Sequence, residues 1–474
     1  MQKRVGSWLV IASLAPLSLA CSSSSSSGPT TQVTMAVVID RTGFSGSYIA
    51  IPDVFQMAFD DVNAGIQKAG GYKGLAFTHT DGDAAGSPAT AAQLATQLVQ
   101  GGAKLVITDN SSDTVAVMKQ DYDADTTNDL NSPILCILCG STLINNPAAT
   151  DPDPVTQAAL QNGKGWNFRL LMASKYLGGI TAARAMIMTG GDLNGDGVIK
   201  MSLYGSNEPQ GTASVNGFAA ALLALAPTAS IEKIFHDPNA DPNGPLWAAD
   251  AIRLTDNQNE TTGTVDGVPD LVFESSLPGT AIAFTKAYIQ GGYTIPLLHG
   301  SPFGNETALL ALGALGDGQE GVGHATYYPG QSANYFIQRY SDHFGSPPDS
   351  HERDGDTTYD SVMLGALATM IAVKDMADPS LVTGAQIRDA MRATNDPNGT
   401  PIYAGPDEIA RAIPLIEAGM PINYQGVSGP LDWDANAFVL GAIAHWKIEN
   451  SRFVDHDLYD CTQDPTCPAL VSTP

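Results

Sequence analysis

The sequence contains few basic residues for its length. Only 23 Lys and Arg stand against 49 Asp and Glu, so the 474 residues carry a formal net charge of −26. No cluster of Lys and Arg offsets this mean, and so acidic a surface repels a polyanion. Nucleic acid is therefore excluded as a partner, whereas the acidity by itself identifies no ligand.

The sequence also lacks a complete catalytic motif. It has neither a His-Glu-x-x-His zinc motif nor a Gly-x-x-x-x-Gly-Lys phosphate loop. Ser301 lies close to His299, but the Gly-x-Ser-x-Gly elbow of hydrolases needs glycine where His299 stands. We interpret His299 as a hydrogen-bonded loop or cleft residue, and we expect a binding protein and not an enzyme.

Beyond the first twenty residues the sequence lacks a long apolar run. The longest, 218–226 and 362–373, fall short of the roughly 18 residues that a membrane-spanning helix needs. Residues 1–20 have two basic residues, an apolar stretch and then Ala20, which is the layout of a cleavable export signal. We expect this segment to be removed.

The end of the signal resembles a bacterial lipobox, in which the cysteine becomes the lipidated first residue. Cys21 follows Ala20, although Ser18 stands where leucine is usual. Residues 21–32 then form a serine-rich tether. Because Ser22 replaces the aspartate linked to inner-membrane retention, we expect a protein of the periplasm or cell envelope, lipid-anchored in the outer membrane. Plain secretion with a free thiol is the alternative.

Cysteine is scarce, with five residues in all. Cys461 and Cys467 lie in a polar C-terminal segment, and we expect them to form a disulfide that closes a short loop. Cys136 and Cys139 lie in an apolar run that predicts a buried strand, where a free cysteine acts as a small hydrophobe. A zinc or redox site would need a polar turn or a second ligand pair.

The rest of the chain alternates short β-branched runs with amphipathic segments. About 440 residues follow the signal and tether, more than one core usually organises, which predicts two domains. The alternation is typical of parallel sheets covered by helices. We expect strands at 33–39, 75–78, 104–107, 134–138, 199–204, 231–235, 271–273 and 295–298. Expected helices are 52–68, one opening at Ser87-Pro88, 114–122, 175–188, 213–225, 246–254 and 280–290.

Several short motifs occur in one order over residues 33–449. They are Thr42-Gly43, 58–65, Asp81-Gly82-Asp83, Asn110-Ser111-Ser112, Asn167-Phe168-Arg169, 269–273, Tyr359-Asp360 and the glycine-rich stretch 426–434. Together they resemble the type I periplasmic binding proteins, and among these the Leu/Ile/Val-binding receptors of branched-chain amino-acid ABC transporters.

This resemblance implies an α/β fold with two lobes joined by a hinge, each lobe a doubly wound parallel sheet flanked by helices. It assigns residues 33–166 and 330–430 to lobe 1, and 167–329 and 431–450 to lobe 2. Residues 451–474 then form a C-terminal tail. In such sheets ligands bind beyond the carboxyl ends of the strands, so two facing lobes form a cleft that closes by hinge motion.

The resemblance also implies ligand-binding residues in lobe 1. It places Ser112, or Ser111 in a shifted register, at the hydroxyl that holds a ligand carboxylate, with Thr142 as its partner beside Ser141. Gly140 falls at the carbonyl that receives the ammonium, and Tyr48 or Ser47 at an aromatic wall. Helix capping is the alternative role for Ser111, Ser112 and Thr142.

Lobe 2 departs from the family pattern. Gln210 stands where amino-acid receptors have tyrosine, and the next aromatic position falls near Ser276 or Leu277. Pro302, before Phe303, replaces the acidic residue that neutralises an α-ammonium. Burying a cation without a counter-charge costs several kcal/mol. We therefore expect a ligand with an anionic or polar acceptor group that need not carry an α-ammonium, unless Glu274 or Glu306 replaces the missing acid.

No cofactor is expected, with one qualification for calcium. Asp192, Asn194 and Asp196 match the first half of an EF-hand-type loop, but the twelfth position is Leu203, so the bidentate carboxylate is missing. A polar turn is the alternative.

The predicted function is capture of an amino acid or related carboxylate or amide for an ABC permease. Presentation of the solute to a signalling partner is the alternative.

Overall fold

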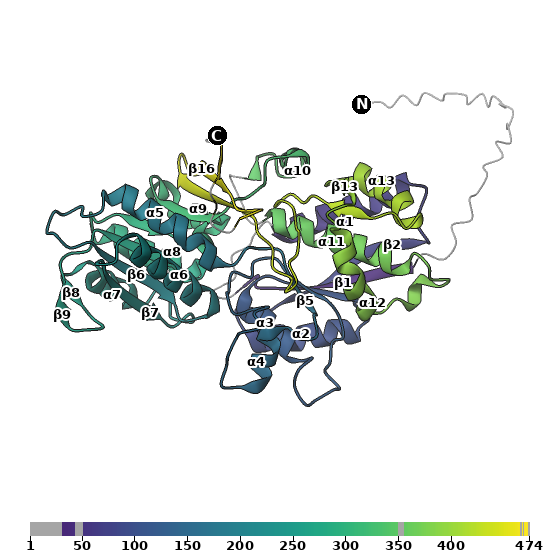
Figure 1. Ribbon diagram of the computed structural model, residues 1–474, viewed down its shortest axis with the longest axis horizontal. Coiled ribbons are helices and arrows are strands. Elements are labelled where there is room, and N and C mark those ends of the chain that lie inside the picture. Colours follow the sequence, from purple (N-terminus) through teal and green to yellow (C-terminus); the bar gives the residue numbers. More distant parts are fainter. Residues whose placement is uncertain (1–30, 43–50, 349–354, 465–466, 468, 473–474) are drawn as a thin grey trace, which may run out of the picture.

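The computed structural model describes residues 31–42, 51–348, 355–464, 467 and 469–472. They form two lobes, which lie side by side in Figure 1 with lobe 1 on the right. Each lobe has its own large sheet, of five strands in lobe 1 and eight in lobe 2. The chain passes between the lobes three times, after residues 169, 324 and 439. The predicted two-lobed α/β fold is confirmed.

The sheet of lobe 1 is parallel throughout, in the order β2-β1-β3-β4-β5. Its central strand alternates between two cores because neighbouring side chains of a strand point to opposite faces. Met35 and Val37 pack in one cluster, and Ala36 and Val38 in the other. The strands are β1 (Thr31–Ile39), β2 (Leu75–Asp83), β3 (Leu105–Thr108), β4 (Ile134–Cys136) and β5 (Asn167–Arg169).

Helices cover both faces of this sheet. The Met35 face packs against α1 (Ile51–Lys68), α11 (Gly355–Val373) and α13 (Pro406–Glu417), and the Ala36 face against α2 (Pro88–Gln100), α3 (Ser111–Lys119) and α4 (Pro154–Gln161). Ser87 caps α2 as predicted, because its side chain accepts a hydrogen bond from the Thr90 N–H. The apolar run 362–373 belongs to α11, which is buried along nearly its whole length.

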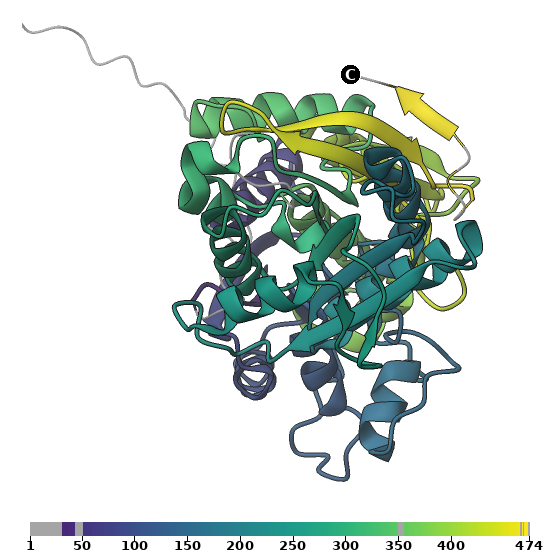
Figure 2. The same cartoon turned by 90° about the vertical axis from the view of Figure 1, so that its left-hand side faces the viewer.

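The sheet of lobe 2 is mixed, in the order β17-β16-β15-β12-β11-β10-β6-β7. The strands β6 (Lys200–Ser206), β7 (Ser230–His236), β10 (Leu271–Ser275), β11 (Leu297–His299) and β12 (Glu320–His324) are parallel. Three antiparallel strands then extend it, β15 (Ala442–Ile448), β16 (Phe453–Asp460) and β17 (Ala469–Ser472). Figure 2 shows this C-terminal hairpin in yellow.

The two faces of the lobe 2 sheet follow the same alternation. Leu271 and Phe273 pack with α5 (Leu177–Thr189) and α6 (Pro209–Leu225), whereas Val272 packs with α7 (Leu246–Thr255) and α8 (Pro278–Gln290). The remaining elements are α9 (Glu306–Leu312), α10 (Gln331–Phe344), α12 (Gly384–Met391), β8 (Gln258–Asn259), β9 (Thr264–Val265), β13 (Thr400–Ile402), β14 (Ile422–Tyr424), η1 (Ser174–Tyr176), η2 (Ser301–Phe303), η3 (Gly313–Gly316), η5 (Pro379–Leu381) and η6 (Arg392–Thr394).

Three of the predicted lobe boundaries need correction. The strand β5 pairs with β4, so residues 167–169 belong to lobe 1 and not to lobe 2. Residues 431–439 also pack with lobe 1, where the Trp433 indole N–H donates to the Arg169 carbonyl oxygen at 2.7 Å. The expected tail 451–474 instead contributes β16 and β17 to the sheet of lobe 2.

Two disulfides lie within the described residues. Cys461 and Cys467 are bonded, as predicted. Cys136 and Cys139, whose pairing the sequence left open, are also bonded to each other. Strand β4 ends at Cys136 instead of continuing to residue 138, and the chain then turns so that Cys139 reaches back.

Two of the sequence motifs meet in lobe 1 around one buried carboxylate. Asp360 of α11 accepts hydrogen bonds from the N–H groups of Val427 and Ser428, each at 2.9 Å, and from the hydroxyls of Ser428 and Tyr424 at 2.7 and 2.6 Å. Gly426 has no space for a side chain, because a Cβ there would lie 2.5 Å from an Asp360 carboxylate oxygen. These bonds hold the start of the glycine-rich stretch against α11 within lobe 1.

Within the described ranges, every helix is too short or too polar to cross a membrane.

Candidate functional site

A pocket of about 80 Å³ lies between the lobes. Its walls come from residues that follow β1 and β3 in lobe 1 and β6, β7 and β10 in lobe 2, so it lies at the carboxyl ends of strands in both sheets. It is small beside the roughly 300 Å³ or more of sites for drug-sized ligands. The described residues that line it are Asp40, Gly86, Pro88, Asn110, Ser112, Asp113, Glu208, Pro238, Asn239 and Leu277.

The lobe 1 wall is acidic. Asp40 directly follows β1, and its carboxylate accepts hydrogen bonds from the Gly86 N–H at 2.7 Å and the Asn110 amide at 3.1 Å. Asp109 follows β3, and its carboxylate accepts from the Asp40 N–H at 2.8 Å and from the backbone and side chain of Asn110. Burial, together with the charges of Asp40 and Asp113, raises the pKa of Asp109 well above its usual range.

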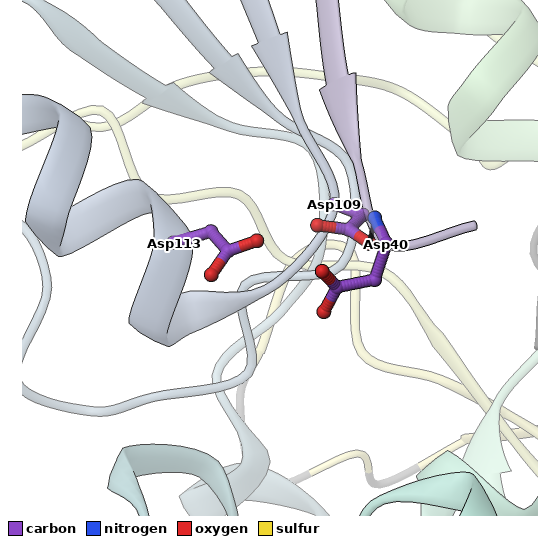
Figure 3. Close-up of side chains that lie close together, drawn as sticks. All are labelled: Asp40, Asp109 and Asp113. Carbon is purple, nitrogen blue, oxygen red and sulfur yellow. Dashed lines mark hydrogen bonds between the residues drawn. The ribbon is translucent and has the colours of Figure 1, made fainter. Parts of the chain in front are cut away.

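Asp113 completes this wall from the first turn of α3. Asn110 caps that helix, because its side-chain oxygen accepts from the Asp113 N–H at 2.9 Å. Asp113 is 1% exposed, and its Oδ2 has no hydrogen-bond partner. Burial and the nearby Asp40 charge raise the pKa of Asp113 to about 7. Figure 3 shows its carboxylate extending from α3 toward those of Asp40 and Asp109.

The lobe 2 wall contains a third lining carboxylate, that of Glu208. It caps α6 by accepting from the N–H groups of Gln210, at 2.7 Å, and Gly211, and it also accepts from the Ser206 hydroxyl at 3.1 Å. Burial raises the pKa of Glu208. Asn239 and Leu277 add a polar and an apolar group to the same wall.

Carboxylates from both lobes therefore face one pocket. The profile of a family described as "Periplasmic binding protein" matches residues 32–410. The chain belongs to this family. Family membership places the protein among the extracytoplasmic solute-binding receptors. No curated protein sequence matches this periplasmic binding protein.

Solved structures share the fold at low identity. A leucine-binding protein, LivK, from Thermotoga maritima is 14% identical with a TM-score of 0.61, covering 90% of this chain and 99% of that one. An ABC-transporter solute-binding protein from R. palustris in complex with benzoate is 18% identical with a TM-score of 0.63, covering 92% and 100%. LivJ from Streptococcus pneumoniae, in complex with isoleucine, is 16% identical with a TM-score of 0.57, covering 89% and 97%.

Two of the predicted ligand-binding residues line the pocket of this periplasmic binding protein, namely Ser112 and Leu277. Ser111 does not, because it is buried and its hydroxyl accepts from the Ser141 N–H at 3.1 Å. The alternative prediction, that Ser111 or Ser112 caps α3, is wrong, because Asn110 is the N-cap residue of this helix. Tyr48, Ser47 and the lipidation residue Cys21 lie outside the described residues.

The loop after β4 contacts lobe 2 beside the pocket. The Gly140 carbonyl accepts from the Ser174 N–H at 2.7 Å, and a Cβ on Gly140 would lie 3.0 Å from the Gln210 side chain. Gly140 and Gln210 thus form an interlobe contact and do not line the pocket. Thr142 is half-buried in the same loop, also away from the pocket lining.

The region around the expected second-lobe acid is occupied by a packed network. Pro302 and Phe303 lie in η2, with the Phe303 ring stacked 3.8 Å from that of His299. The His299 ring also lies 3.2 Å from a Glu274 carboxylate oxygen, and both residues are fully buried. Glu274 and Glu306 are absent from the pocket lining, so Glu208, from a different strand end, is the lobe 2 carboxylate there.

The predicted calcium loop has the hydrogen bonds of a polar turn. The Asp192 carboxylate accepts from the N–H groups of Gly195 and Gly197 at 2.8 and 2.9 Å, and Asp196 accepts from the Val198 N–H at 2.8 Å. The Asn194 amide donates to the Val268 carbonyl at 2.6 Å. Calcium binding at this loop stays a prediction.

The motif comparison missed the acidic residues of the pocket. Asp40 comes directly after the predicted strand 33–39, Asp109 comes two residues after the predicted strand 104–107, and Glu208 stands before the helix that follows β6. Because the carboxyl ends of parallel strands meet at one edge, acidic residues at these positions were a usable signal.

Proposed function

We propose that this protein is an exported, lipid-anchored receptor that captures a small polar solute between its lobes for an ABC-type importer. The observation that carries the proposal is the pocket itself, which takes lining residues from the strand ends of both lobes. A solute held there contacts both lobes at once and so favours the closed arrangement over the open one.

The solute is an amino acid or a related small compound with both an acceptor and a donor. The Ser112 hydroxyl donates to its acceptor group, in line with the isoleucine and benzoate carboxylates of the receptors of similar fold. Glu208 on the facing wall accepts from its ammonium or amide, because each carboxylate oxygen has more than one lone pair. Glu208 therefore takes the role that Pro302 cannot perform.

A thermal-shift screen of the mature chain against amino acids, amides, amines and small carboxylates identifies the solute, since binding the folded state raises its stability. Calorimetry then compares Glu208→Gln and Ser112→Ala with the parent. Each variant loses one charge-assisted hydrogen bond, worth about 1.5–3 kcal/mol, so affinity falls by about one to two decades.

Glu417→Gln is the matched control, because Glu417 is exposed at the end of α13, in the lobe 1 face that carries no pocket residue. It should bind the solute as the parent does. Unchanged affinity in both pocket variants would contradict the proposed site. Small-angle scattering should also give a smaller radius of gyration with solute, and no change at saturation would contradict closure.

Lipid anchoring at Cys21 is tested separately. Mass spectrometry of membrane-extracted protein should find a diacylglyceryl-modified cysteine at the new N-terminus, and Cys21→Ser should release the protein from the membrane fraction. An N-terminus elsewhere would leave a soluble receptor as the remaining form of the proposal.

A further inference from the structure

Three carboxylates converge at the edge of the pocket, from three separate places in lobe 1. Asp40 follows β1, Asp109 follows β3 and Asp113 lies in the first turn of α3. One oxygen of each lies within 4.8 Å of the others, and the residues are 1%, 0% and 1% exposed. Figure 3 shows the three carboxylates pointing into a common space.

The charges of Asp109 and Asp113 are not balanced by the protein. Asp109 accepts hydrogen bonds only from neutral donors, the Asp40 N–H and the backbone and side chain of Asn110. Asp113 keeps an oxygen with no partner at all. Among the described residues no Lys, Arg or His forms an ion pair with either carboxylate. An unpaired buried carboxylate costs several kcal/mol, so these groups are neutralised either by protons, in line with their raised pKa values, or by a positive ion that the described residues do not supply.

The separation of the oxygens suits a divalent metal ion. Calcium takes oxygen ligands at about 2.3–2.6 Å, so two ligands on opposite sides of the ion lie about 5 Å apart. The oxygens all lie within this span, and calcium accepts the irregular geometry of carboxylates already held by backbone hydrogen bonds, whereas magnesium demands a near-ideal octahedron. An all-carboxylate set is also typical of hard cations and not of zinc or copper.

We propose that Asp40, Asp109 and Asp113 bind one divalent cation, with calcium preferred over magnesium. The ion enters from the pocket, which Asp40 and Asp113 line, and the pocket volume leaves room for water molecules that complete its coordination. The bound ion replaces a repulsive acidic wall by a neutralised one, so that a solute carboxylate can approach Ser112. This site does not depend on which solute the receptor carries.

The test uses the mature chain freed of metal with EDTA and then dialysed. Calorimetry with calcium chloride alone should give one site per chain, with magnesium binding at least tenfold more weakly. Because extracellular calcium modules bind at about 10⁻⁴–10⁻³ M, the titration extends to about 10 mM. Asp113→Asn keeps the shape of the side chain and should lower calcium affinity at least tenfold.

Asp192→Asn is the matched control, since it alters the exposed calcium-like loop of lobe 2. It should leave calcium binding unchanged. Circular dichroism and thermal unfolding verify that both variants fold, and manganese-soaked crystals of the unmodified chain should show an anomalous peak between the three carboxylates.

Absence of calcium heat and of a manganese peak would overturn the site. Loss of binding in Asp192→Asn with full binding in Asp113→Asn would also overturn it, in favour of the loop. Because the metal alone is the probe, a failed solute screen leaves this result unaffected, and a failed metal titration leaves the solute receptor standing.

Discussion

Replacement of Glu320 by glutamine should destabilise lobe 2 at neutral pH. Glu320 lies on β12, and its Oε2 is 2.6 Å from Arg184 on α5, 2.7 Å from His445 on β15 and 3.7 Å from Lys447. The carboxylate therefore ties the C-terminal hairpin and a covering helix to the parallel part of the sheet. Burial alone would raise its pKa, but the hydrogen bonds from His445 and Arg184 outweigh burial and lower the pKa of Glu320 to about 2.

The size of the expected loss follows from the difference between the pKa of Glu320 in the folded and in the unfolded protein. The folded-state pKa lies about 2.5 units below the ordinary value of 4.5, and each unit corresponds to about 1.36 kcal/mol. The group is only 12% exposed, so solvent screening removes little of this. Ionised Glu320 thus contributes about 3 kcal/mol at pH 7. Because its folded pKa is depressed, that stability is complete above pH 4.5 and is lost as the pH falls toward 2.

Urea unfolding at pH 7 and at about pH 3 tests this. Glu320→Gln should lose about 3 kcal/mol at pH 7 but only about 1 kcal/mol at pH 3, where much of the wild-type contribution is already gone. The exposed Glu417→Gln control should change stability by less than about 0.5 kcal/mol at both values. A loss below about 1 kcal/mol at pH 7, or one that is the same at both pH values, would refute the reasoning.

Two further perturbations test lobe 1. Asp360→Ala leaves the buried N–H groups of Val427 and Ser428 without an acceptor, at about 1–3 kcal/mol each, and urea unfolding should show a loss of about 3–5 kcal/mol. A smaller loss than about 1 kcal/mol would mean that water replaces the carboxylate. Replacing both Cys136 and Cys139 by serine should cost about 2 kcal/mol, because the loop they close is short. Alkylation of the unfolded, unreduced chain should leave both cysteines unlabelled, and labelling would contradict the disulfide.

The periodic part of the fold could be predicted from the sequence. Strand 33–39 has β-branched and apolar residues on both faces, and the structure buries both. The predictions fail where the pairing of strands that lie far apart in the sequence decides whether a segment becomes a strand and to which lobe it belongs. Strand β16, 453–460, mixes four apolar or aromatic residues with four charged or polar ones and lacks a strict alternation, and it becomes a strand because β15 offers it a partner. Residues 167–169 were likewise assigned to the wrong lobe because only β4 fixes their place.

The residues of the candidate site also divide into those that the sequence could predict and those that it could not. A motif comparison could locate Ser112, since the Asn110-Ser111-Ser112 motif follows a strand, and the structure places Ser112 in the first turn of α3 at the pocket. It could not show which of the 49 acidic residues converge, because Asp40 and Asp109 are 69 positions apart and meet only through the pairing of β1 with β3. The Glu208 carboxylate reaches the same pocket from the other lobe, which no local pattern encodes.

The buried aspartates of lobe 1 fall into two physical classes, and the difference separates structure from function. Asp61 accepts from the hydroxyls of Tyr335 and Tyr359, each at 2.8 Å, and pairs with Arg339 at 3.2 Å. Asp360 is equally saturated by donors. Such carboxylates hold the fold together, because every bond they need is supplied by the chain.

Asp113 has the same burial but an oxygen without a partner, and it faces two further carboxylates instead of an arginine. Nothing in packing requires this, since asparagine would fit the same space without the charge. The chain supplies hydrogen-bond donors to Asp61 and Asp360 but leaves one oxygen of Asp113 without a donor. Keeping this acidic residue buried lowers the stability of the protein when nothing is bound there. At the proposed cation site, binding of the ion offsets that cost, which would tie the acidic wall to binding and not to folding.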